Sequence, residues 1–502
     1  MLELRPFGPV PGAKENLMNL RNGYLRAALA ALSGGLLVLS FPPFGIWPLA
    51  WAAFVPLLMA AMESPTARGA ADLGALAGLV FYSVSLHWMY GLFGPLAAAF
   101  WCIFSVWPGL FAWLLWGIDR RRLFPGLRER YRPLLFTAAA GLLWAGLEYF
   151  RAEVWWLQCG WLAIGYSQTP FTAILQTCSL IGVYGLSALI LSANAALFLL
   201  ISGKRRAPAA AMLLLSAALA VWGLHRETAF PSENGRKLKV ALVQDESADL
   251  KSLTSLSLGR EAAGADLLIW PEYSFPAASD RDPGDIALLA KALKGSGATA
   301  VVGAAVMPDE KLRTPLRDFM WLLSPDGKLL GRYDKMHPVP FVEKALRDTW
   351  KNMPPDRHPR PVDTPAGRLG TQICYDLDFE NGSRLMARQG AQILAVDSLD
   401  PEAWGRWQHL QHSSMAPARA VEEGLWVVRA ASSGTSQIID PAGRVRAALG
   451  PGTSGVLSGE AWLLAPGTFY SRAGWLFGPL SLLFALAFSL LAAARALPKN
   501  RR

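Results

Sequence analysis

Three side chains in this chain are of the types that acyl transfer through a thiol requires. Glu272, Lys335 and Cys374 each follow a short run of residues that is typical of a buried strand. A thiol attacks as the thiolate, and a nearby carboxylate can take its proton. A fixed ammonium group can stabilise both the thiolate and the oxyanion that forms when a carbonyl is attacked. These residue types therefore predict Cys374 as the nucleophile, Glu272 as the general base and Lys335 as the stabilising cation.

None of the three residues is specific when it is considered alone. A cysteine in an apolar strand is most often part of the core, and a lone charged residue after a strand is usually at the surface. Their shared position at strand ends makes the set informative, because one edge of a sheet could bring all three together. No Cys-x-x-Cys pair or Cys/His cluster is present, so we expect no metal ion and no cofactor.

The segment 236–466 must position these residues, and its pattern indicates a layered α/β domain. Runs typical of buried strands lie at 238–244, 265–270, 299–304, 369–374, 391–396 and 425–430. A β-hairpin is expected around the turn Pro325-Asp326-Gly327. Helical patterns lie at 283–293, 381–389 and 408–423.

The composition indicates a membrane protein. Hydrophobic residues make up 52% of the 502 residues and charged residues only 17%, whereas soluble domains contain about 25% charged residues. The formal net charge of +10 does not predict nucleic-acid binding. Many Lys and Arg residues lie in short loops between apolar stretches, where such residues set membrane topology.

Eight apolar stretches have lengths near the ~20 residues that a bilayer requires. They lie at 27–43, 47–62, 72–91, 95–117, 133–150, 173–201, 208–224 and 474–495. The second and the seventh are short. The sequence therefore predicts a membrane domain of about seven helices over 1–226, a catalytic domain over 236–466 and a final transmembrane helix over 474–495.

The short loops predict the orientation. The loops with Arg68, with residues 120–132 and with residues 204–206 contain the Lys and Arg, whereas the loops at 44–47 and 92–94 contain none. By the positive-inside rule both termini face the cytoplasm. The catalytic domain then lies on the opposite side, which is the periplasm in a bacterium with two membranes.

Two features of the membrane part leave alternatives open. Glu148 and Arg151 end the fifth stretch, and they either serve a function at membrane depth or satisfy each other as an i,i+3 pair. The aromatic-rich loop 154–168 is either an interfacial belt or part of an entrance for lipid.

The order, setting and spacing of Glu272, Lys335 and Cys374 resemble those of the nitrilase (carbon–nitrogen hydrolase) superfamily. The membrane part is similar to that of bacterial apolipoprotein N-acyltransferases in five segments. These are Phe41-Pro42-Pro43-Phe44-Gly45, Leu86-His87-Trp88-Met89-Tyr90, Trp144 with Glu148 and Arg151, Gly165-Tyr166-Ser167-Gln168, and Gly182-Val183-Tyr184-Gly185-Leu186-Ser187. The resemblance covers nearly the whole chain. It implies a membrane α-helical bundle of about eight spans with a nitrilase-like domain layered α-β-β-α.

The resemblance also implies a function. Cys374 would attack a phospholipid ester, and the resulting thioester would acylate the α-amino group of the diacylglyceryl-cysteine of an apolipoprotein. The implied partners are a phospholipid donor, a diacylated apolipoprotein acceptor and the membrane, without nucleic acid. The implied location is the bacterial inner membrane, and we expect a monomer.

Supporting residues follow from the same resemblance. Glu343 matches a family glutamate beside the site, although a solvated loop charge is the alternative. Tyr375 and Asp376 follow the nucleophile, where the family usually has Tyr and Glu. Trp404 ends the stretch 397–404, which replaces an Asn-Asp-x-Trp-Phe motif in a region expected to face substrate. His409 is a candidate supporting residue, with packing near a helix start as its expected role.

The altered stretch motivates a second hypothesis. A divergent membrane-bound amidase or acyltransferase would use the same Glu, Lys and Cys chemistry with a different acceptor. A non-enzymatic membrane scaffold is disfavoured, because it has no need for the three residues together.

Overall fold

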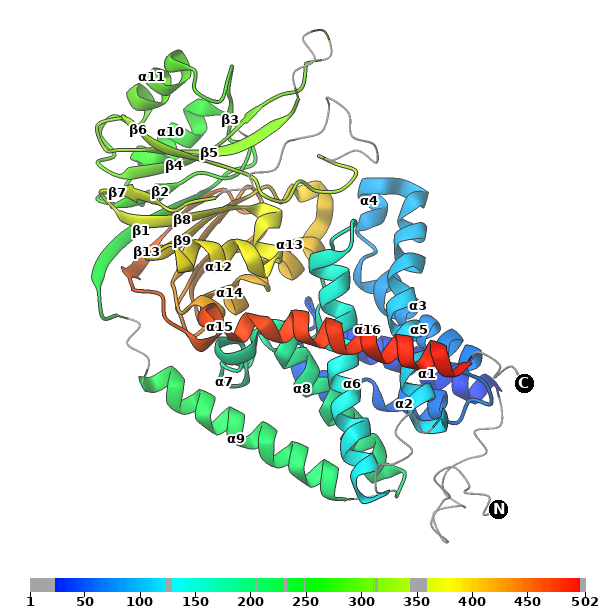
Figure 1. The fold of residues 1–502 in the computed structure, drawn as a ribbon. Helices are drawn as coiled ribbons and strands as arrows, with labels where there is room; N and C mark the ends of the chain where they lie inside the picture. The colour runs from blue at the N-terminus through cyan, green and yellow to red at the C-terminus, as the bar shows by residue number, and fades with distance from the viewer. Residues whose placement is uncertain are drawn as a thin grey trace, which may run out of the picture.

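A computed structural model describes residues 23–121, 129–203, 206–229, 233–247, 249–309, 311, 315–343 and 359–496. The chain forms a helical region, which lies along the bottom and right of Figure 1, and an α/β region, which lies at the upper left. The last helix, α16, returns from the α/β region to the helical region.

The helical region contains the eight predicted apolar stretches. Its helices are α1 (Gly23–Ser40), α2 (Val55–Met62), α3 (Ala67–Ser85), α4 (Met89–Phe93), α5 (Ala97–Arg121), α6 (Arg132–Tyr149), α7 (Thr172–Leu175), α8 (Cys178–Ile201), α9 (Ala207–Ala229) and α16 (Phe477–Ala496). Among the described residues, six helical segments are long and apolar enough to cross a membrane. The second predicted stretch is instead a 3-10 turn followed by the eight-residue α2. The third, at 72–91, begins inside α3 and extends beyond its end at Ser85 into α4, and α3 carries Arg68 and Asp72.

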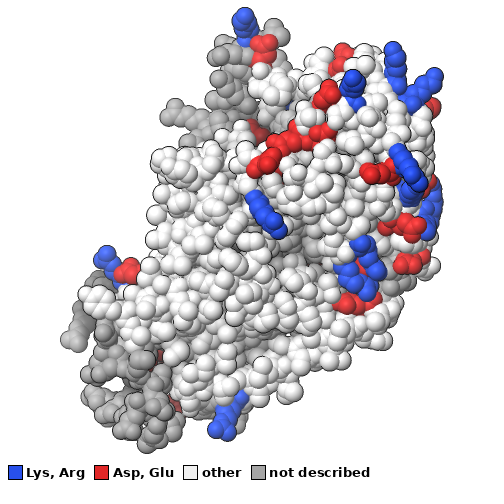
Figure 2. All heavy atoms as spheres, turned by 180° about the vertical axis from the view of Figure 1, so that it is seen from behind, with Lys and Arg blue, Asp and Glu red and all other residues white. Residues whose placement is uncertain are grey.

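The surface of the helical region is apolar. Leu213 and Leu214 of α9 and Leu480 and Leu490 of α16 are more than half exposed. Figure 2 shows the charged side chains gathered over the α/β region and few over the helices. Exposed apolar surface of this extent fits hydrocarbon rather than water. The chain is therefore a multi-pass membrane protein. Most of the basic residues that predict its orientation, at 122–128, 204–205 and 499–502, lie outside the described residues, so the orientation stays a prediction.

The α/β region contains two stacked sheets. The first has the order β13-β1-β2-β4-β5-β6, with β3 (Phe275–Pro276) beside β4. Its other strands are β1 (Arg236–Gln244), β2 (Leu267–Ile269), β4 (Thr299–Val306), β5 (Arg317–Leu323), β6 (Leu329–Asp334) and β13 (Gly455–Leu463). The second has the order β12-β11-β10-β9-β8-β7. Its strands are β7 (Val362–Thr364), β8 (Gly367–Ile373), β9 (Ile393–Ser398), β10 (Val427–Ala431), β11 (Ser436–Ile439) and β12 (Val445–Leu449).

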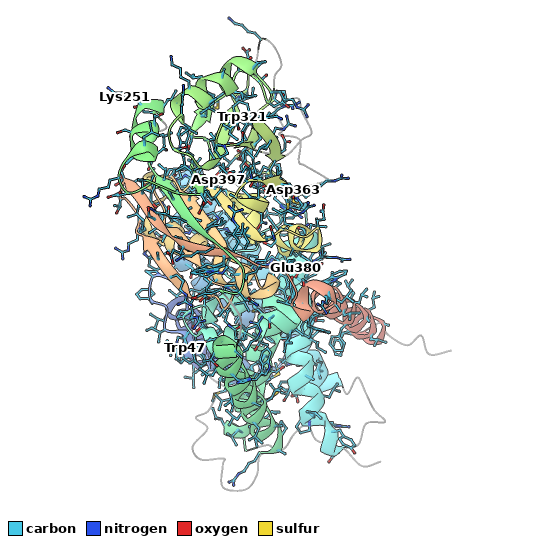
Figure 3. The ribbon with its side chains drawn as sticks, turned by 90° about the vertical axis from the view of Figure 1, so that its left-hand side faces the viewer. Trp47, Lys251, Trp321, Asp363, Glu380 and Asp397 are labelled. Carbon is cyan, nitrogen blue, oxygen red and sulfur yellow. The ribbon has the colours of Figure 1, made fainter. Side chains whose placement is uncertain are left out.

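Helices cover the outer face of each sheet, which confirms the layered α-β-β-α prediction. α10 (Leu250–Leu258) and α11 (Pro283–Ala292) cover the first sheet, and α12 (Glu380–Arg388) and α14 (Ala416–Glu423) cover the second. The Asp249 and Asp282 side chains cap α10 and α11 by accepting from backbone N–H groups in the first turn. In Figure 3 the labelled Lys251 lies on the outer α10 layer, Asp397 lies within the stacked sheets and Glu380 lies beside the helical region.

The helix expected over 408–423 is wrong in one respect, because two helices occupy this segment. α13 (Gly405–Ser413) ends three residues before α14 begins. Pro417 stands in the first turn of α14, where a backbone N–H would have no partner within the helix. Inside a continuous helix, the proline would remove one backbone hydrogen bond.

Hydrogen bonds join the two regions. The Glu422 carboxylate of α14 accepts from the Val183 N–H at 2.9 Å, where α8 is interrupted at Gly182. The Gln411 amide of α13 donates to the Ser85 carbonyl at 2.9 Å. The face of the α/β region that carries α13 and α14 is therefore fixed against the helices.

Candidate active site

The three predicted residues meet where the two sheets end together. Glu272 follows β2 and Lys335 follows β6, both in the first sheet, whereas Cys374 follows β8 in the second. The expectation of a single sheet edge is therefore wrong. Stacked sheets lie about 10 Å apart, so the ends of strands from different sheets can share one site.

Lys335 lies at the centre of a buried group of carboxylates. Its Nζ lies 2.7 Å from Glu272 Oε1, 2.8 Å from Glu343 Oε1 and 3.1 Å from Asp318 Oδ2. We call these four residues the Lys335 cluster. The three acids are grouped closely enough to hold a cation, and the Lys335 ammonium supplies positive charge among them.

The charges in the Lys335 cluster follow from burial and pairing. Burial acts to raise the pKa of Glu272, but the charge of Lys335 and hydrogen bonds from Asp318 and Lys335 outweigh it, and the pKa lies below its ordinary value. For Asp318, burial outweighs the attraction of Lys335 and raises the pKa well above its ordinary value. Burial acts to lower the pKa of Lys335, yet the acids around it raise it well above the ordinary value. The Lys335 cluster thus favours the ionised form of Glu272, beside the Lys335 cation, and the protonated form of Asp318.

Cys374 has a strained backbone at the point where β8 turns into a 3-10 helix. Its φ is +47°, and Tyr273 and Phe341 nearby also have positive φ, at +58° and +65°. Such conformations cost on the order of 1–3 kcal/mol each and gather at functional sites. The sulfur lies 3.8 Å from the Leu399 carbonyl oxygen, and the Leu399 N–H donates to Glu272.

The thiol is protonated at rest. Burial, reinforced by the negative charge of Glu272, raises the pKa of Cys374 well above its ordinary value. A buried thiol that faces an ionised carboxylate becomes nucleophilic when that carboxylate takes its proton. The arrangement can therefore generate the thiolate as a carbonyl arrives, rather than hold it permanently.

Glu343 lies inside the Lys335 cluster and not in solvent. Its Oε1 also accepts from the Tyr273 hydroxyl at 2.8 Å, and its Oε2 accepts from the Val339 N–H at 2.7 Å. This carboxylate therefore ties the segment after β6 to the turn after β2.

Asp376 is buried and joins the two sheets. It accepts from the Tyr333 hydroxyl and the His337 N–H at 2.7 Å each, and from the Ile373 N–H at 3.2 Å. Burial acts to raise its pKa, but His337 and Tyr333 outweigh this and lower it. Asp376 therefore holds the segment of Lys335 beside the segment of Cys374.

A cavity in front of Cys374 is walled by both regions of the molecule. The helical region and its loops contribute Leu86, Trp88, Met89, Leu92, Phe93, Phe100, Phe104, Leu157, Cys159 and Trp161. The α/β region contributes Val339, Pro340, Phe341, Val342, Cys374, Tyr375, Trp404, Gln408 and His412. The lining is almost entirely apolar, which suits a hydrocarbon chain.

Three of the five predicted supporting residues lie away from the cavity. Tyr375 and Trp404 line it, whereas Glu343, Asp376 and His409 are absent from the described residues that do so. His409 is buried in α13, and its Nε2 lies 2.8 Å from the Pro401 carbonyl. Asp397, in the stretch expected to face substrate, is fully buried in β9.

The polar residues that end the fifth span support the cavity wall. Glu148 accepts from the Ile164 N–H at 2.8 Å, and Arg151 donates to the Trp161 carbonyl at 2.9 Å. The two side chains form no ion pair with each other in the described part of the chain. They instead fix the aromatic loop 154–168, whose Trp161 reaches the cavity.

Sequence reasoning missed Asp318 and His412. Asp318 could have been found, because the hairpin turn at 325–327 sets a register that places it opposite Lys335, whose N–H donates to the Asp318 carbonyl. His412 lies in a segment read as a plain helix, and no local pattern distinguishes it.

Comparisons with known proteins match both regions. The model of the apolipoprotein N-acyltransferase N-terminal domain matches residues 33–196, and the carbon–nitrogen hydrolase model matches residues 239–462. An apolipoprotein N-acyltransferase of Geobacter metallireducens is 35% identical over 500 residues, covering 91% of this chain and 92% of the relative. One of Gloeobacter violaceus is 30% identical and covers 96% of each chain.

Two solved structures are similar to about half of the chain. Nit3 of Saccharomyces cerevisiae, a member of the nitrilase superfamily, is 20% identical with a TM-score of 0.38, and the match covers 53% of this chain and 96% of Nit3. An amidase from Nesterenkonia sp. is 22% identical with a TM-score of 0.37, and the match covers 48% of this chain and 95% of the amidase.

Proposed function

Because the chain belongs to the apolipoprotein N-acyltransferase family, we propose that it moves a fatty acyl chain from a phospholipid to the α-amino group of a diacylated apolipoprotein. The observation that carries this proposal is the apolar cavity in which Cys374 meets walls from the membrane helices. A phospholipid can extend an acyl chain into such a cavity and present its ester to the sulfur. The enzyme is then an acyltransferase with Glu272, Lys335 and Cys374 as its catalytic residues.

The first half-reaction forms a thioester. Glu272 takes the Cys374 proton, and the sulfur attacks the ester carbonyl carbon. The oxyanion that develops is stabilised by the Lys335 ammonium. As the tetrahedral intermediate collapses, the carbon–oxygen ester bond breaks and Glu272 returns its proton to the departing oxygen. A lysophospholipid leaves, and the acyl chain stays on Cys374 within the apolar cavity.

The second half-reaction forms an amide. The neutral α-amine attacks the thioester carbonyl, and Lys335 again faces the oxyanion. Glu272 takes a proton from the attacking nitrogen and returns it to the departing sulfur, which restores the thiol. The apolar lining of the cavity protects the thioester from water between the two steps.

We place the catalytic domain, residues 236–466, on the periplasmic side of the inner membrane. The predicted division into 1–226, 236–466 and 474–495 belongs to this proposal, as does the monomeric state. The basic loops and the positive-inside rule support this orientation.

The full-length protein in phospholipid micelles tests the proposal. With an acyl-labelled phospholipid, intact-protein mass spectrometry should detect one acyl thioester, and a diacylated lipopeptide should then become triacylated. Cys374→Ala should abolish both products, because no sulfur remains to carry the chain, and Cys178→Ala, at a buried cysteine in α8, is the matched control. Label on Cys374→Ala at the wild-type rate would refute the assignment. A thioester that never reaches the lipopeptide would support the alternative acceptor.

A further inference from the structure

The proposed reaction releases one proton, from the acceptor ammonium, that Glu272 does not accept. An α-amino group has a pKa near 8, so the acceptor reaches the enzyme mostly as an ammonium ion. Ester plus ammonium gives alcohol, amide and one free proton. Glu272 takes and returns one proton in each half-reaction and ends as it began. The surplus proton must leave the ammonium before its nitrogen can attack, and this step needs a separate acceptor.

A second polar group faces the cavity from the α13 side. His412 lines the same cavity as Cys374, and its ring stacks on Trp161 with centroids 5.5 Å apart. Its Nδ1 lies 2.7 Å from Asp400 Oδ1. Nδ1 also lies 3.0 Å from Arg429 Nη2, which can only donate, but the Asp400 contact is the shorter of the two. A proton on Nδ1 that bonds to the ionised Asp400 leaves Nε2 as the atom that can exchange a proton.

Asp400 is built to stay ionised. Arg429 donates to its Oδ2 at 2.5 Å, and the Gln408 amide donates to its Oδ1 at 2.9 Å. Burial acts to raise the pKa of Asp400, but His412 and Arg429 outweigh it and lower the pKa below its ordinary value. Asp400 therefore orients the imidazole as a fixed acceptor.

Asp378 lies on the other side of the ring. Its Oδ1 is 3.6 Å from His412 Nε2, and neither of its oxygens has a hydrogen-bond partner among the described residues. Burial raises its pKa to about 7, with His412 acting against the rise. The Trp161 side chain is a neighbouring donor that acts to lower the Asp378 pKa. A buried carboxyl group beside an unbonded ring nitrogen can stabilise an imidazolium that forms there.

We call Asp378, Asp400, His412 and Arg429 the His412 cluster. Three elements place charged or titratable groups against the His412 ring. Asp400 comes from the loop after β9, Asp378 from the 3-10 helix after β8, and Arg429 from β10. The further groups that interact with Asp378 are Arg419, Cys159, Tyr166 and Tyr375.

We propose that His412, oriented by Asp400 and backed by Asp378, takes the surplus proton from the acceptor ammonium in the cavity. One nitrogen–hydrogen bond of the ammonium breaks, one forms at Nε2, and the free amine attacks the thioester. The imidazolium then releases the proton to water. This inference rests on the proposed function and assigns His412 a role in the second half-reaction alone.

His412→Gln tests the inference when the two half-reactions are measured separately. Thioester formation should stay within twofold of wild type. Transfer from the preformed thioester to the lipopeptide should fall about tenfold at pH 7, because only about a tenth of an amine with a pKa near 8 is then neutral. The deficit should disappear by pH 9.5. Asp378→Asn should show a smaller deficit with the same pH dependence.

Two controls separate this role from a structural one. Hydroxylamine, which is already neutral at pH 7, should discharge the thioester of His412→Gln and of wild type at equal rates. His409→Gln changes a histidine of the same helix outside the cavity, and it should alter both half-reactions equally or neither.

A deficit in His412→Gln that persists at pH 9.5, or an equal loss in both half-reactions, would overturn the inference. Absence of a thioester in the wild type would instead overturn the proposed function.

Discussion

The Lys335 and His412 clusters both act on Cys374 through their charges, and they differ in how fully they are bonded. In the Lys335 cluster, Asp318 Oδ1 is the one buried side-chain atom without a hydrogen bond among the described residues. In the His412 cluster, both Asp378 oxygens, His412 Nε2 and Arg429 Nε lack one in the same part of the chain. A fully bonded cluster has fixed charges, whereas an incompletely bonded one can gain or lose a proton at lower cost. The Lys335 cluster is therefore suited to stabilise charge, and the His412 cluster to transfer protons.

The largest expected effect comes from removing the fixed charge. Lys335→Met leaves three acids without their cation, and we expect thioester formation to fall about 10²–10³-fold, as for other lost oxyanion donors. The loss of a buried partner should also destabilise the fold by about 3–5 kcal/mol. Rapid-quench mass spectrometry measures the first effect and thermal unfolding the second. Lys328→Met, in the exposed turn of the same hairpin, is the control, and a rate for Lys335→Met within threefold of wild type would contradict the assignment.

The acid dependence of the two half-reactions should differ by several pH units. The pKa of Glu272 is lowered, so the base stays ionised as pH falls and is lost only below its ordinary value of about 4.3. Thioester formation should therefore hold down to about pH 4.3. Transfer to the amine should decline below pH 7, about tenfold per pH unit, as the acceptor amine, with a pKa near 8, holds its proton. Single-turnover rates from pH 4 to 9 measure both, and coincident profiles would remove the distinction between the clusters.

The smallest expected effects separate the acids within the Lys335 cluster. Glu343→Gln weakens the hydrogen bond with the Lys335 ammonium. A hydrogen bond to a charged group contributes about 1.5–3 kcal/mol, so thioester formation should fall about tenfold. Burial raises the pKa of Asp318 and favours its protonated form, which Asp318→Asn imitates, so the rate should stay within about threefold. A larger loss from Asp318→Asn than from Glu343→Gln would show that Asp318 is ionised.

The sequence predicted the parts of the site that lie on regular local patterns. Glu272, Lys335 and Cys374 each follow a strand, and the α/β layering follows from alternating strand and helix patterns. The distribution of the strands between two sheets could not be predicted, because it depends on long-range pairing such as that of β1 with β13. The position of Asp318 opposite Lys335 could have been predicted from the register of the β5–β6 hairpin.

The cavity and the His412 cluster could not be derived from local patterns. Trp88 and Phe93 were visible only as parts of apolar stretches, and their approach to the site depends on how α4 sits against the α/β region. His412 is one polar residue on a short helix, and its role depends on Asp378 and Asp400, which come from two other elements. Tertiary contacts of this kind leave no periodic signature in a single chain.

Aromatic pairs close the seam between the two regions that wall the cavity. Phe100 packs against Phe341 with ring centroids 5.4 Å apart, and Phe44 packs against Trp407 at 5.5 Å. An α/β region expressed without the helices would expose one ring of each pair to water, and it would leave the Cys374 sulfur without the cavity walls that the helical region supplies. A hydrophobic compound bound between Phe44 and Trp407, which lie outside the cavity lining, would inhibit the enzyme by separating its two regions, without competing for either substrate.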